Sequence, residues 1–355
     1  MLKTLLVVFV LLSAVLLIFL NSFKKNILIS PGIGSVSPFI KAEIPVKNLA
    51  VEEVFKTDHN FLQNYPQDKL IKIIATGDII PARYINFQTV KRNNFNWPYE
   101  KTFEVLKNAD LTFANLESPL IKNCPVVSDG MVFCGDEKNI GGLKFAGIDL
   151  VNLANNHFGN YGKSGVDETI KSLKENNIAV TGLNGAQIIE IKGIKFAFLG
   201  YNDVGKEPLV SSVSENKISK EISEAKKEAD VAIVAFHWGA EYTAQPNQRQ
   251  KDLAHLSIDS GADLIIGNHP HWIQPVEIYH NKFITYAHGN FIFDQFWSEK
   301  TLEGVIGKYT FYKNKLIDVE FLPIQIDNFG QPAFLEGNKK EEILNNMYHE
   351  SLNLK

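Results

Sequence analysis

The sequence predicts an α/β protein in which helices cover a β-sheet. From Ile71 onward, short β-rich runs alternate with stretches of helical periodicity, an alternation that is typical of layered α/β folds. Several apolar runs end in Asp, Glu, Asn or His, as expected where a ligand site forms at the carboxyl ends of strands. The composition, with 45% apolar and 21% charged residues, is that of a globular protein and excludes disordered, collagen-like and coiled-coil chains.

The predicted elements follow one another in a regular order. The predicted strands are Ile71–Thr76, Leu111–Ala114, Leu150–Leu153, Ile178–Thr181, Ile194–Leu199, Val231–Phe236, Leu264–Ile266 and Phe283–Ala287, with a closing hairpin of Val305–Phe311 and Leu316–Phe321. The predicted helices are Tyr99–Lys107, Ser164–Asn176, Ser219–Glu228 and Asn247–Ser260, with a short helix near Val51–Phe55 and a weak one near Glu341–Tyr348.

An apolar run, Leu5–Leu20, stands near the N-terminus and is interrupted only by Ser13. At about 1.5 Å per residue it spans roughly 24 Å, slightly less than a bilayer core. Lys24 and Lys25 follow without a small-residue cleavage site, so we expect residues 1–25 to form an uncleaved single-pass membrane anchor. A cleaved signal peptide is the alternative. Residues 26–67 are expected to form a stalk or linker, 68–328 the main domain and 329–355 a polar tail.

Cys124 and Cys134 are the only cysteines and are separated by nine residues rich in turn formers. This close pair favours a disulfide across a hairpin, with two free thiols as the alternative. Because disulfides persist in oxidising compartments, the pair and the anchor together predict a main domain on the extracytoplasmic side of the cell membrane.

The charge balance bears on possible partners. The 36 basic and 40 acidic residues leave a net charge of −4. Without Lys3, Lys24 and Lys25, 33 basic residues face 40 acidic ones, which is a net charge of −7 for the remainder. A body this acidic argues against broad nucleic-acid binding, which needs a basic face.

Five of the predicted strands run into residues that can bind a metal. These are Gly77-Asp78, Asn115-Leu116-Glu117, Asn155-Asn156-His157, His237-Trp238-Gly239 and Gly267-Asn268-His269-Pro270-His271. Each has an ordinary alternative, because a Gly-Asp after a strand is usually a turn or cap and a lone histidine is usually hydrogen-bonded in the core. Their joint occurrence predicts a site for one or two divalent ions, Mn, Fe or Zn.

These motifs, together with Gly77-Asp78-Ile79-Ile80-Pro81-Ala82-Arg83, Ser118-Pro119 and Gly289-Asn290-Phe291, resemble those of the bacterial capsule-synthesis proteins of the CapA/PgsA family. The resemblance covers about residues 70–325 and implies a role with poly-γ-glutamate capsules. The family resembles a branch of the calcineurin-like metallophosphoesterases, which implies a four-layer sandwich of two mixed β-sheets flanked by helices. The main domain, 68–328, is expected to have this fold.

The resemblance also implies roles for single residues. It implies that Asp78, Glu117, Asn156, His237, His269 and His271 are metal ligands, with Glu117 between two ions and His157 assisting the leaving group. Two departures from the wider superfamily matter. Ile80 stands where that superfamily has a histidine, and Glu117 replaces an aspartate, so one metal position loses a ligand.

Other residues near the motifs have weaker assignments. Arg83 is expected to neutralise a phosphate or a carboxylate, with a surface ion pair as the alternative. Asn155 and Asn290 are expected to support the site from behind the ligands. The remaining candidates are Glu241, Asp263 and Asp294, which can orient histidines but are not expected as ligands, and Trp238 and Trp272, which can line the pocket mouth or belong to the core.

The sequence therefore predicts a membrane-anchored, metal-dependent hydrolase or phosphoesterase. Its expected partners are an anionic polymer such as poly-γ-glutamate, or a phosphorylated precursor, and other membrane subunits of capsule synthesis. The alternatives are a non-catalytic assembly subunit that uses the inherited site to bind the polymer, and an intracellular nucleotide phosphoesterase, which the N-terminal run disfavours.

Overall fold

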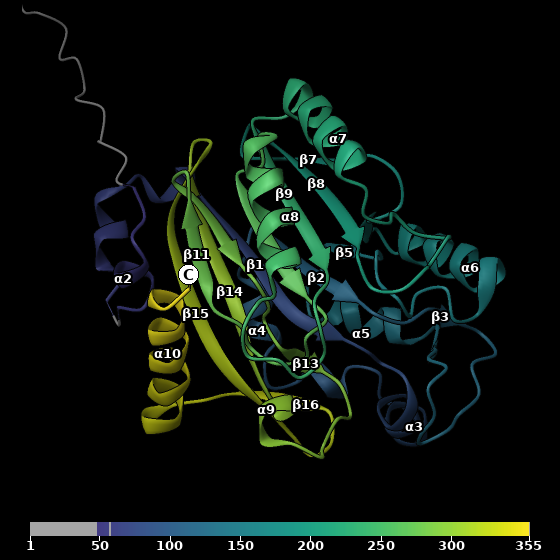
Figure 1. Ribbon diagram of the computed structural model, residues 1–355. Helices are drawn as coiled ribbons and strands as arrows, with labels where there is room; N and C mark the ends of the chain where they lie inside the picture. The colour runs from purple at the N-terminus through teal and green to yellow at the C-terminus, as the bar shows by residue number, and fades with distance from the viewer. Residues whose placement is uncertain (1–47, 57, 355) are drawn as a thin grey trace, which may run out of the picture. The chain divides into compact units, whose positions relative to one another are not determined.

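The computed structural model describes residues 48–56 and 58–354 (Figure 1). The membrane anchor predicted over Leu5–Leu20 lies outside these residues. Within the described ranges, no helix combines the length and the apolar character needed to cross a bilayer.

The larger sheet has eight strands in the order β16-β15-β14-β1-β2-β5-β6, with β13 also paired to β1. These strands are β1 (Leu70–Ile79), β2 (Leu111–Leu116), β5 (Leu150–Asn152), β6 (Ala179–Thr181), β13 (Asn290–Ile292), β14 (Glu303–Tyr312), β15 (Lys315–Asp327) and β16 (Gln331–Phe334). The β1, β2, β5, β6 and β13 strands pair in parallel, whereas β14, β15 and β16 are antiparallel. The sheet is therefore mixed.

The second sheet has six strands in the order β11-β12-β10-β9-β8-β7. Its strands are β7 (Gln187–Ile191), β8 (Ile194–Asn202), β9 (Val231–His237), β10 (Leu264–Asn268), β11 (Val276–Tyr279) and β12 (Lys282–Thr285). The four central strands are parallel and the two edge strands are antiparallel, so this sheet is mixed as well. A separate two-stranded ribbon pairs β3 (Leu120–Ile121) with β4 (Gly135–Asp136).

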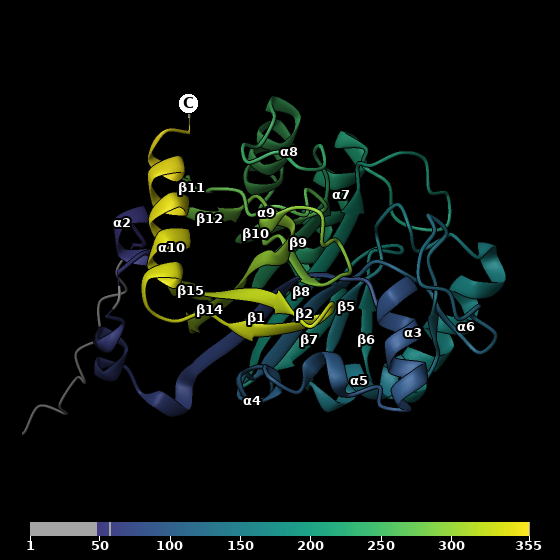
Figure 2. The ribbon, with the colours of Figure 1, turned by 90° about the horizontal axis from the view of Figure 1, so that it is seen from below.

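The alternation of side chains along the strands divides the apolar core into layers. Ile73 of β1 packs in the same cluster as Phe198 and Ile233 of the second sheet, which places this cluster between the sheets. The next residue, Ile74, points to a cluster on the opposite face of its sheet. That cluster includes residues of α5 (Asn139–Phe145) and α6 (Gly162–Glu175), and α7 (Glu215–Glu228) and α8 (Gln248–Asp259) cover the outer face of the second sheet (Figures 1 and 2). The prediction of mixed sheets flanked by helices is confirmed.

Several elements differ from the sequence prediction. The helix predicted at Tyr99–Lys107 is a 3₁₀ turn, η3 (Trp97–Tyr99), followed by α4 (Phe103–Lys107), because the chain leaves helical geometry at Thr102 with φ −127°. The elements that the sequence did not predict include α3 (Arg83–Arg92), α9 (Glu299–Leu302) and strands β3, β4, β7, β11, β13 and β16. The apolar residues of α3 do not form a stripe on one face, so the helical period is weak there.

The segments outside 68–328 also pack on the sheets. The helix α2 (Val51–Val54) is followed by the 3₁₀ turns η1 (Asn60–Asn64) and η2 (Gln67–Lys69). After residue 328, which the sequence predicts to begin a tail, β16 joins the larger sheet and α10 (Gly337–Leu352) follows. Val54, Ile343 and Met347 lie in the same cluster as the residues between the two sheets. Figure 2 shows α2 and α10 side by side at one end of the sandwich.

The strand β1 runs beyond the predicted Thr76 because it gains a second parallel neighbour, β13, which pairs Asp78 with Asn290. Asp78 N–H donates to Gly289 O at 3.0 Å. This close approach requires a glycine before Asp78, because a Cβ on Gly77 would lie 2.2 Å from Gly289 O.

Replacing Gly77 by alanine is expected to lower the free energy of unfolding by about 1–3 kcal/mol, the usual cost of forcing atoms into a packed interior. Gly141→Ala is the matched control, since its Cβ would meet nothing within 4 Å and it lies inside α5. It is expected to be neutral or to stabilise by up to about 1 kcal/mol. Equilibrium unfolding in urea measures both changes, and equal stability of the two variants would contradict the close approach at Gly77.

Candidate metal centre

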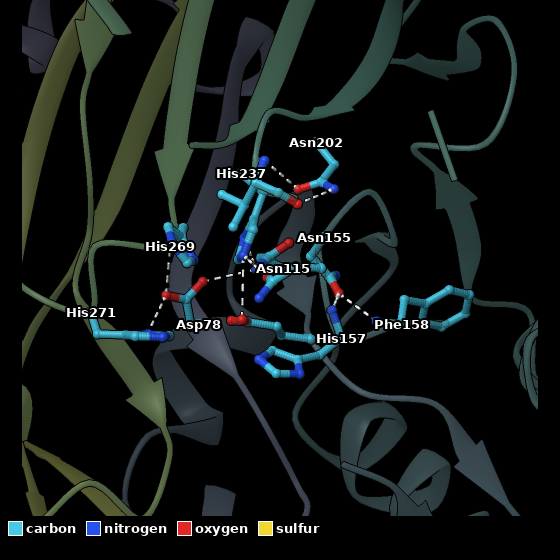
Figure 3. Close-up of polar contacts among 12 residues, drawn as sticks. Asp78, Asn115, Asn155, His157, Phe158, Asn202, His237, His269 and His271 are labelled. Carbon is cyan, nitrogen blue, oxygen red and sulfur yellow. Dashed lines mark hydrogen bonds and ion pairs between the residues drawn. The ribbon is translucent and has the colours of Figure 1, made fainter. Parts of the chain in front are cut away.

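The carboxyl ends of parallel strands from both sheets bring the predicted ligands together. Asp78 is the next-to-last residue of β1, and Glu117 directly follows β2. His237 is the last residue of β9, and His269 directly follows β10 (Figure 3). All four side chains are buried. One point of the fold therefore collects residues that lie far apart in the sequence, as expected for a ligand site in an α/β sheet.

Asp78 is the hub of this cluster and is fully buried. Its Oδ1 accepts a hydrogen bond from Asn115 Nδ2 at 2.8 Å, and its Oδ2 lies 3.1 Å from His271 Nδ1 and 3.3 Å from His269 N (Figure 3). Burial raises the pKa of the Asp78 carboxyl, but the hydrogen bond from His271 and the charges of His271 and His237 outweigh burial, so that its pKa is lowered overall. The Asp78 side chain is therefore a carboxylate at neutral pH.

His271 is held by two oxygen acceptors. Its Nδ1 lies 2.9 Å from Asn290 Oδ1 as well as 3.1 Å from Asp78 Oδ2. Since both partners accept, Nδ1 carries a proton and Nε2 is the ring atom left to bind a ligand. Burial lowers the pKa of His271, but the Asp78 hydrogen bond and the charge of Glu117 raise it to about 9. Asn290 is itself oriented by its Nδ2, which donates to Thr301 O at 2.9 Å. Asn290 thus lies directly behind a predicted ligand.

Glu117 is buried without the donors that a carboxylate normally requires. Within the described part of the chain, neither of its carboxylate oxygens has a hydrogen-bond partner, although the side chain is 0% exposed. Its Oε1 lies 3.3 Å from His237 Nε2. A buried carboxylate without hydrogen-bond donors costs several kcal/mol, and a cation beside it would offset that cost.

His237 faces Glu117 and the side-chain oxygen of Asn156. Its Nε2 lies 2.7 Å from Asn156 Oδ1, and its Nδ1 lies 3.2 Å from Asn115 Nδ2. The Asn115 side chain therefore contacts both His237 and Asp78. It links a residue of the second sheet to one of the larger sheet. The sequence motif contains Asn115, but sequence reasoning assigned it no role.

The donor atoms form three overlapping groups, each with ligand atoms within 4.8 Å of one another. The groups are Glu117, His237 and His269; Asp78, Glu117 and His271; and Glu241, His269 and His271. Carboxylate oxygens and imidazole nitrogens are ligands of Zn, Mn and Fe. Together with the unpartnered oxygens of Glu117, this donor set fits a divalent metal.

The two histidines after β10 have unusual backbone geometry. His269 has φ +99° and His271 has φ +56°, on either side of Pro270. Such conformations cost about 1–3 kcal/mol each for non-glycine residues and persist where the surroundings impose them. The segment is held by Asp78 at His269 N and by Tyr242 N–H, which donates to Pro270 O at 2.8 Å.

His157 lies beside the cluster with one ring nitrogen available. Its ring packs on Phe133, with centroids 4.1 Å apart, and its Nδ1 lies 3.1 Å from Asn160 Oδ1. The same oxygen accepts from Phe133 N–H at 2.8 Å, so His157 Nδ1 is the donor and Nε2 takes no part in this contact. Burial lowers the pKa of His157, and the charge of Glu117 opposes this only in part. Asn155 positions the loop by accepting from the N–H groups of His157 and Phe158 (Figure 3).

Arg83 lines a pocket that also contains His157 and His271, but its side chain is already paired. It forms an ion pair with Asp294, which lies 211 residues away in the sequence, and donates to Gly130 O at 3.2 Å. Its guanidinium lies 4.9 Å from the ring centroids of both Phe133 and Phe293. This ion pair is largely buried, with the two side chains 15% and 4% exposed, and so is not the surface ion pair given as the alternative from the sequence; Asp294 neutralises the charge of Arg83.

Cys124 and Cys134 form a disulfide in the structure, with a Cα–Cα distance of 5.8 Å. The loop that they close forms one wall of the pocket in front of the cluster. This cavity, of about 300 Å³, is lined by Arg83, Ser128, Asp129, Met131, Phe133, His157, Glu241, Tyr242, His271, Phe293, Asp294, Gln295 and Trp297. The disulfide therefore braces a segment that faces His157 and His271.

The remaining candidates lie away from the cluster. Trp238 is fully buried and stacks on Phe236, so it belongs to the core and not to the pocket mouth. Trp272 lines a different cavity. Asp263 forms ion pairs with Lys226 and Lys282 and does not orient a histidine of the cluster.

Comparisons with known proteins place the chain in a family. Residues 72–295 match the family described as "Bacterial capsule synthesis protein PGA_cap". The chain is 30% identical over 342 residues to "Capsule biosynthesis protein CapA" of Bacillus anthracis, covering 89% of this chain and 80% of that protein. It is 29% identical over 303 residues to "PGA biosynthesis protein CapA" of Bacillus subtilis (strain 168), covering 80% and 79%.

A solved structure is also similar in part. The crystal structure of a novel phosphatase from Mycoplasma pneumoniae aligns with a TM-score of 0.48 and 17% identity, covering 72% of this chain and 94% of that chain. At a TM-score below 0.5 this likeness supports no conclusion about fold or activity. The family match and the two relatives, by contrast, span most of the chain: it belongs to the family of bacterial capsule synthesis proteins.

Proposed function

We propose that this protein is a metal-dependent hydrolase of capsule or poly-γ-glutamate synthesis, which acts on an anionic surface polymer or its phosphorylated precursor. The observation that carries the proposal is the buried Glu117 carboxylate, whose oxygens have no hydrogen-bond partner in the described residues and lie among histidines. The names of the CapA relatives support the connection with capsule and PGA synthesis. The predicted N-terminal anchor would hold the domain at the outer face of the cell membrane, beside other membrane subunits of capsule synthesis.

Six side chains would hold the metal. Glu117 belongs to two donor groups and would lie between two ions. His237, His269 and Asn156 would hold one position, and Asp78 and His271 the other. When bound, a divalent ion supplies Lewis-acid stabilisation of the charge that develops on a phosphoryl or carbonyl oxygen.

Other residues would transfer a proton or hold the predicted ligands in position. His157 Nε2 faces the pocket and is placed to move a proton to or from the leaving group, because Nδ1 is fixed on Asn160. Asn290 and Asp78 hold the His271 ring through its Nδ1, and Asn115 holds Asp78 and the His237 ring. This fixed arrangement lowers the reorganisation that the reaction requires.

The pocket also bears on how an acidic protein would accept an anionic substrate. Asp294 neutralises Arg83, and Asp129 and Glu241 add negative charge to the pocket lining. An anionic group therefore finds no free guanidinium there. Bound cations at the Glu117 cluster would provide the attraction, so that substrate binding and metal binding would depend on each other.

A non-catalytic assembly subunit is the second candidate, and one observation favours it. Ile80 stands where the wider superfamily has a histidine ligand, and it is fully buried in an apolar cluster with Phe133 and Phe293. A site with fewer ligands can bind the polymer through a cation without cleaving it.

The test is hydrolysis by the purified full-length chain after loading with Mn²⁺. The two probes are bis(p-nitrophenyl) phosphate, for phosphodiester cleavage, and poly-γ-glutamate, whose chain length is followed on a gel. We expect cleavage of at least one probe that stops when the metal is removed with EDTA. Metal-bound protein that cleaves neither probe and yet retains poly-γ-glutamate would favour the assembly subunit.

A further inference from the structure

We propose that the Glu241 carboxylate is a metal ligand, which closes the solvent-facing side of the cation site together with His269 and His271. The inference rests on the proposed function only in that the site holds divalent cations. From the sequence, Glu241 was expected to orient a histidine and not to be a ligand. It lies four residues beyond His237, outside any strand.

The geometry of the donor atoms is the first support. One carboxylate oxygen of Glu241 and one ring nitrogen each of His269 and His271 lie within 4.8 Å of one another. Both histidines are shared with the buried donor groups, His269 with that of His237 and His271 with that of Asp78. An ion held by His269 or by His271 would therefore be within reach of Glu241.

The backbone holds Glu241 at this position. Gly239 has φ +86° and turns the chain directly after β9, where a Cβ would lie 2.6 Å from the Gln250 side chain. Tyr242 has φ +60° and its N–H donates to Pro270 O at 2.8 Å. This bond fastens the residue after Glu241 to the proline between the two histidines.

A side-chain network links the same loop to the ligands. Tyr242 OH accepts from Gln295 Nε2 at 3.0 Å, and Gln295 Oε1 accepts from Asn290 Nδ2 at 3.2 Å. The Oδ1 of Asn290 in turn accepts from His271 Nδ1 at 2.9 Å. Tyr242 and His271 are thus positioned by one chain of hydrogen bonds, which fixes the loop relative to the site.

An independent observation points to a ligand at this place. His269 is 3% exposed, and within the ranges that the structure describes its Nδ1 has no hydrogen-bond partner. Buried ring nitrogens are normally paired, so this atom implies a missing partner. Glu241 is exposed and brings a charged oxygen donor close to His269 and His271.

The experiment titrates Mn²⁺ into the metal-free full-length chain by calorimetry and counts bound Mn²⁺ by elemental analysis. Glu241→Gln keeps the size of the side chain and removes its charge. We expect this substitution to raise the dissociation constant of the most weakly bound Mn²⁺ that the titration resolves. The expected increase is about 10-fold or more, the range seen when groups that support a metal site are removed. Asp129→Asn is the matched control, because Asp129 lines the same pocket and carries the same charge but belongs to none of the three donor groups.

The control separates a ligand from a nearby charge. A loss of affinity in Glu241→Gln that is absent in Asp129→Asn supports the proposal, whether the wild-type chain binds one ion or two. Unchanged binding in Glu241→Gln, or equal losses in the two variants, overturns it. A wild-type chain that binds no Mn²⁺ contradicts the proposed function as well, so the two failures are distinguishable. Equal urea midpoints of the metal-free proteins show that both variants fold.

Discussion

Replacing Glu117 by glutamine is expected to abolish stabilisation of the protein by Mn²⁺. Glu117 belongs to two of the three donor groups and its oxygens have no hydrogen-bond partner in the described chain, so both proposed ion positions would depend on its charge. At a free Mn²⁺ concentration about 100 times the dissociation constant, the wild-type chain is expected to gain about 2.7 kcal/mol of unfolding free energy. The variant is expected to gain almost none. Urea unfolding with and without Mn²⁺ measures the difference.

The metal-free proteins provide the control for this result. Glutamine has nearly the same shape as glutamate, and the substitution removes a buried carboxylate without breaking a hydrogen bond. The metal-free variant is therefore expected to be at least as stable as the wild-type chain. A variant that gains as much stability from Mn²⁺ as the wild type would show that the cation binds elsewhere.

Replacing His157 by asparagine is expected to lower kcat by about 10²–10⁴-fold while leaving bound Mn²⁺ unchanged. The ring lies beside the donor groups but belongs to none of them, and its Nε2 is the atom left for the substrate. Steady-state kinetics and metal analysis on the same preparation separate the two effects. Loss of Mn²⁺ along with activity would instead make His157 a part of the metal site.

The leaving group gives a sharper form of this prediction. A p-nitrophenolate leaves without needing a proton, whereas a simple alkoxide must be protonated as it leaves. The loss of kcat in His157→Asn is therefore expected to be large for an alkyl phosphate ester and small for a p-nitrophenyl ester. Equal losses on the two esters would contradict proton transfer from His157. Unchanged activity on both esters would show that His157 takes no part in the reaction.

The sequence predicts the centre of the site well because strand ends are a local signal. Asp78, Glu117, His237 and His269 each stand at or directly after the end of a β-rich run, and parallel packing alone brings such residues together. The motifs that resemble a known family added the separate ligand roles. The layered order of helices and strands is equally local, since it depends on periodicity within each segment.

What the sequence misses depends on contacts between distant segments. The sequence leaves open whether Arg83 binds an anion or forms an ion pair, and no pattern near Arg83 indicates Asp294 as its partner. Glu241 stands in a loop whose path is set by the bond from Tyr242 N–H to Pro270 O. The sequence predicts only a weak helix near Glu341–Tyr348, because α10 has few apolar residues and depends on packing against the sheets. The local sequence sign of the turn toward Glu241 is the glycine at position 239, which has a positive φ in the structure.

We propose that the buried carboxylate and histidines hold a divalent metal on which hydrolysis depends. The most direct measurement follows bound metal and hydrolysis of bis(p-nitrophenyl) phosphate and poly-γ-glutamate in one sample of the full-length chain, before EDTA treatment, after it and after reloading with Mn²⁺. The account predicts that cleavage disappears when the metal is removed and returns in proportion to the Mn²⁺ that binds again. Cleavage that persists in the metal-free chain, or a chain that binds no Mn²⁺ at all, would contradict it.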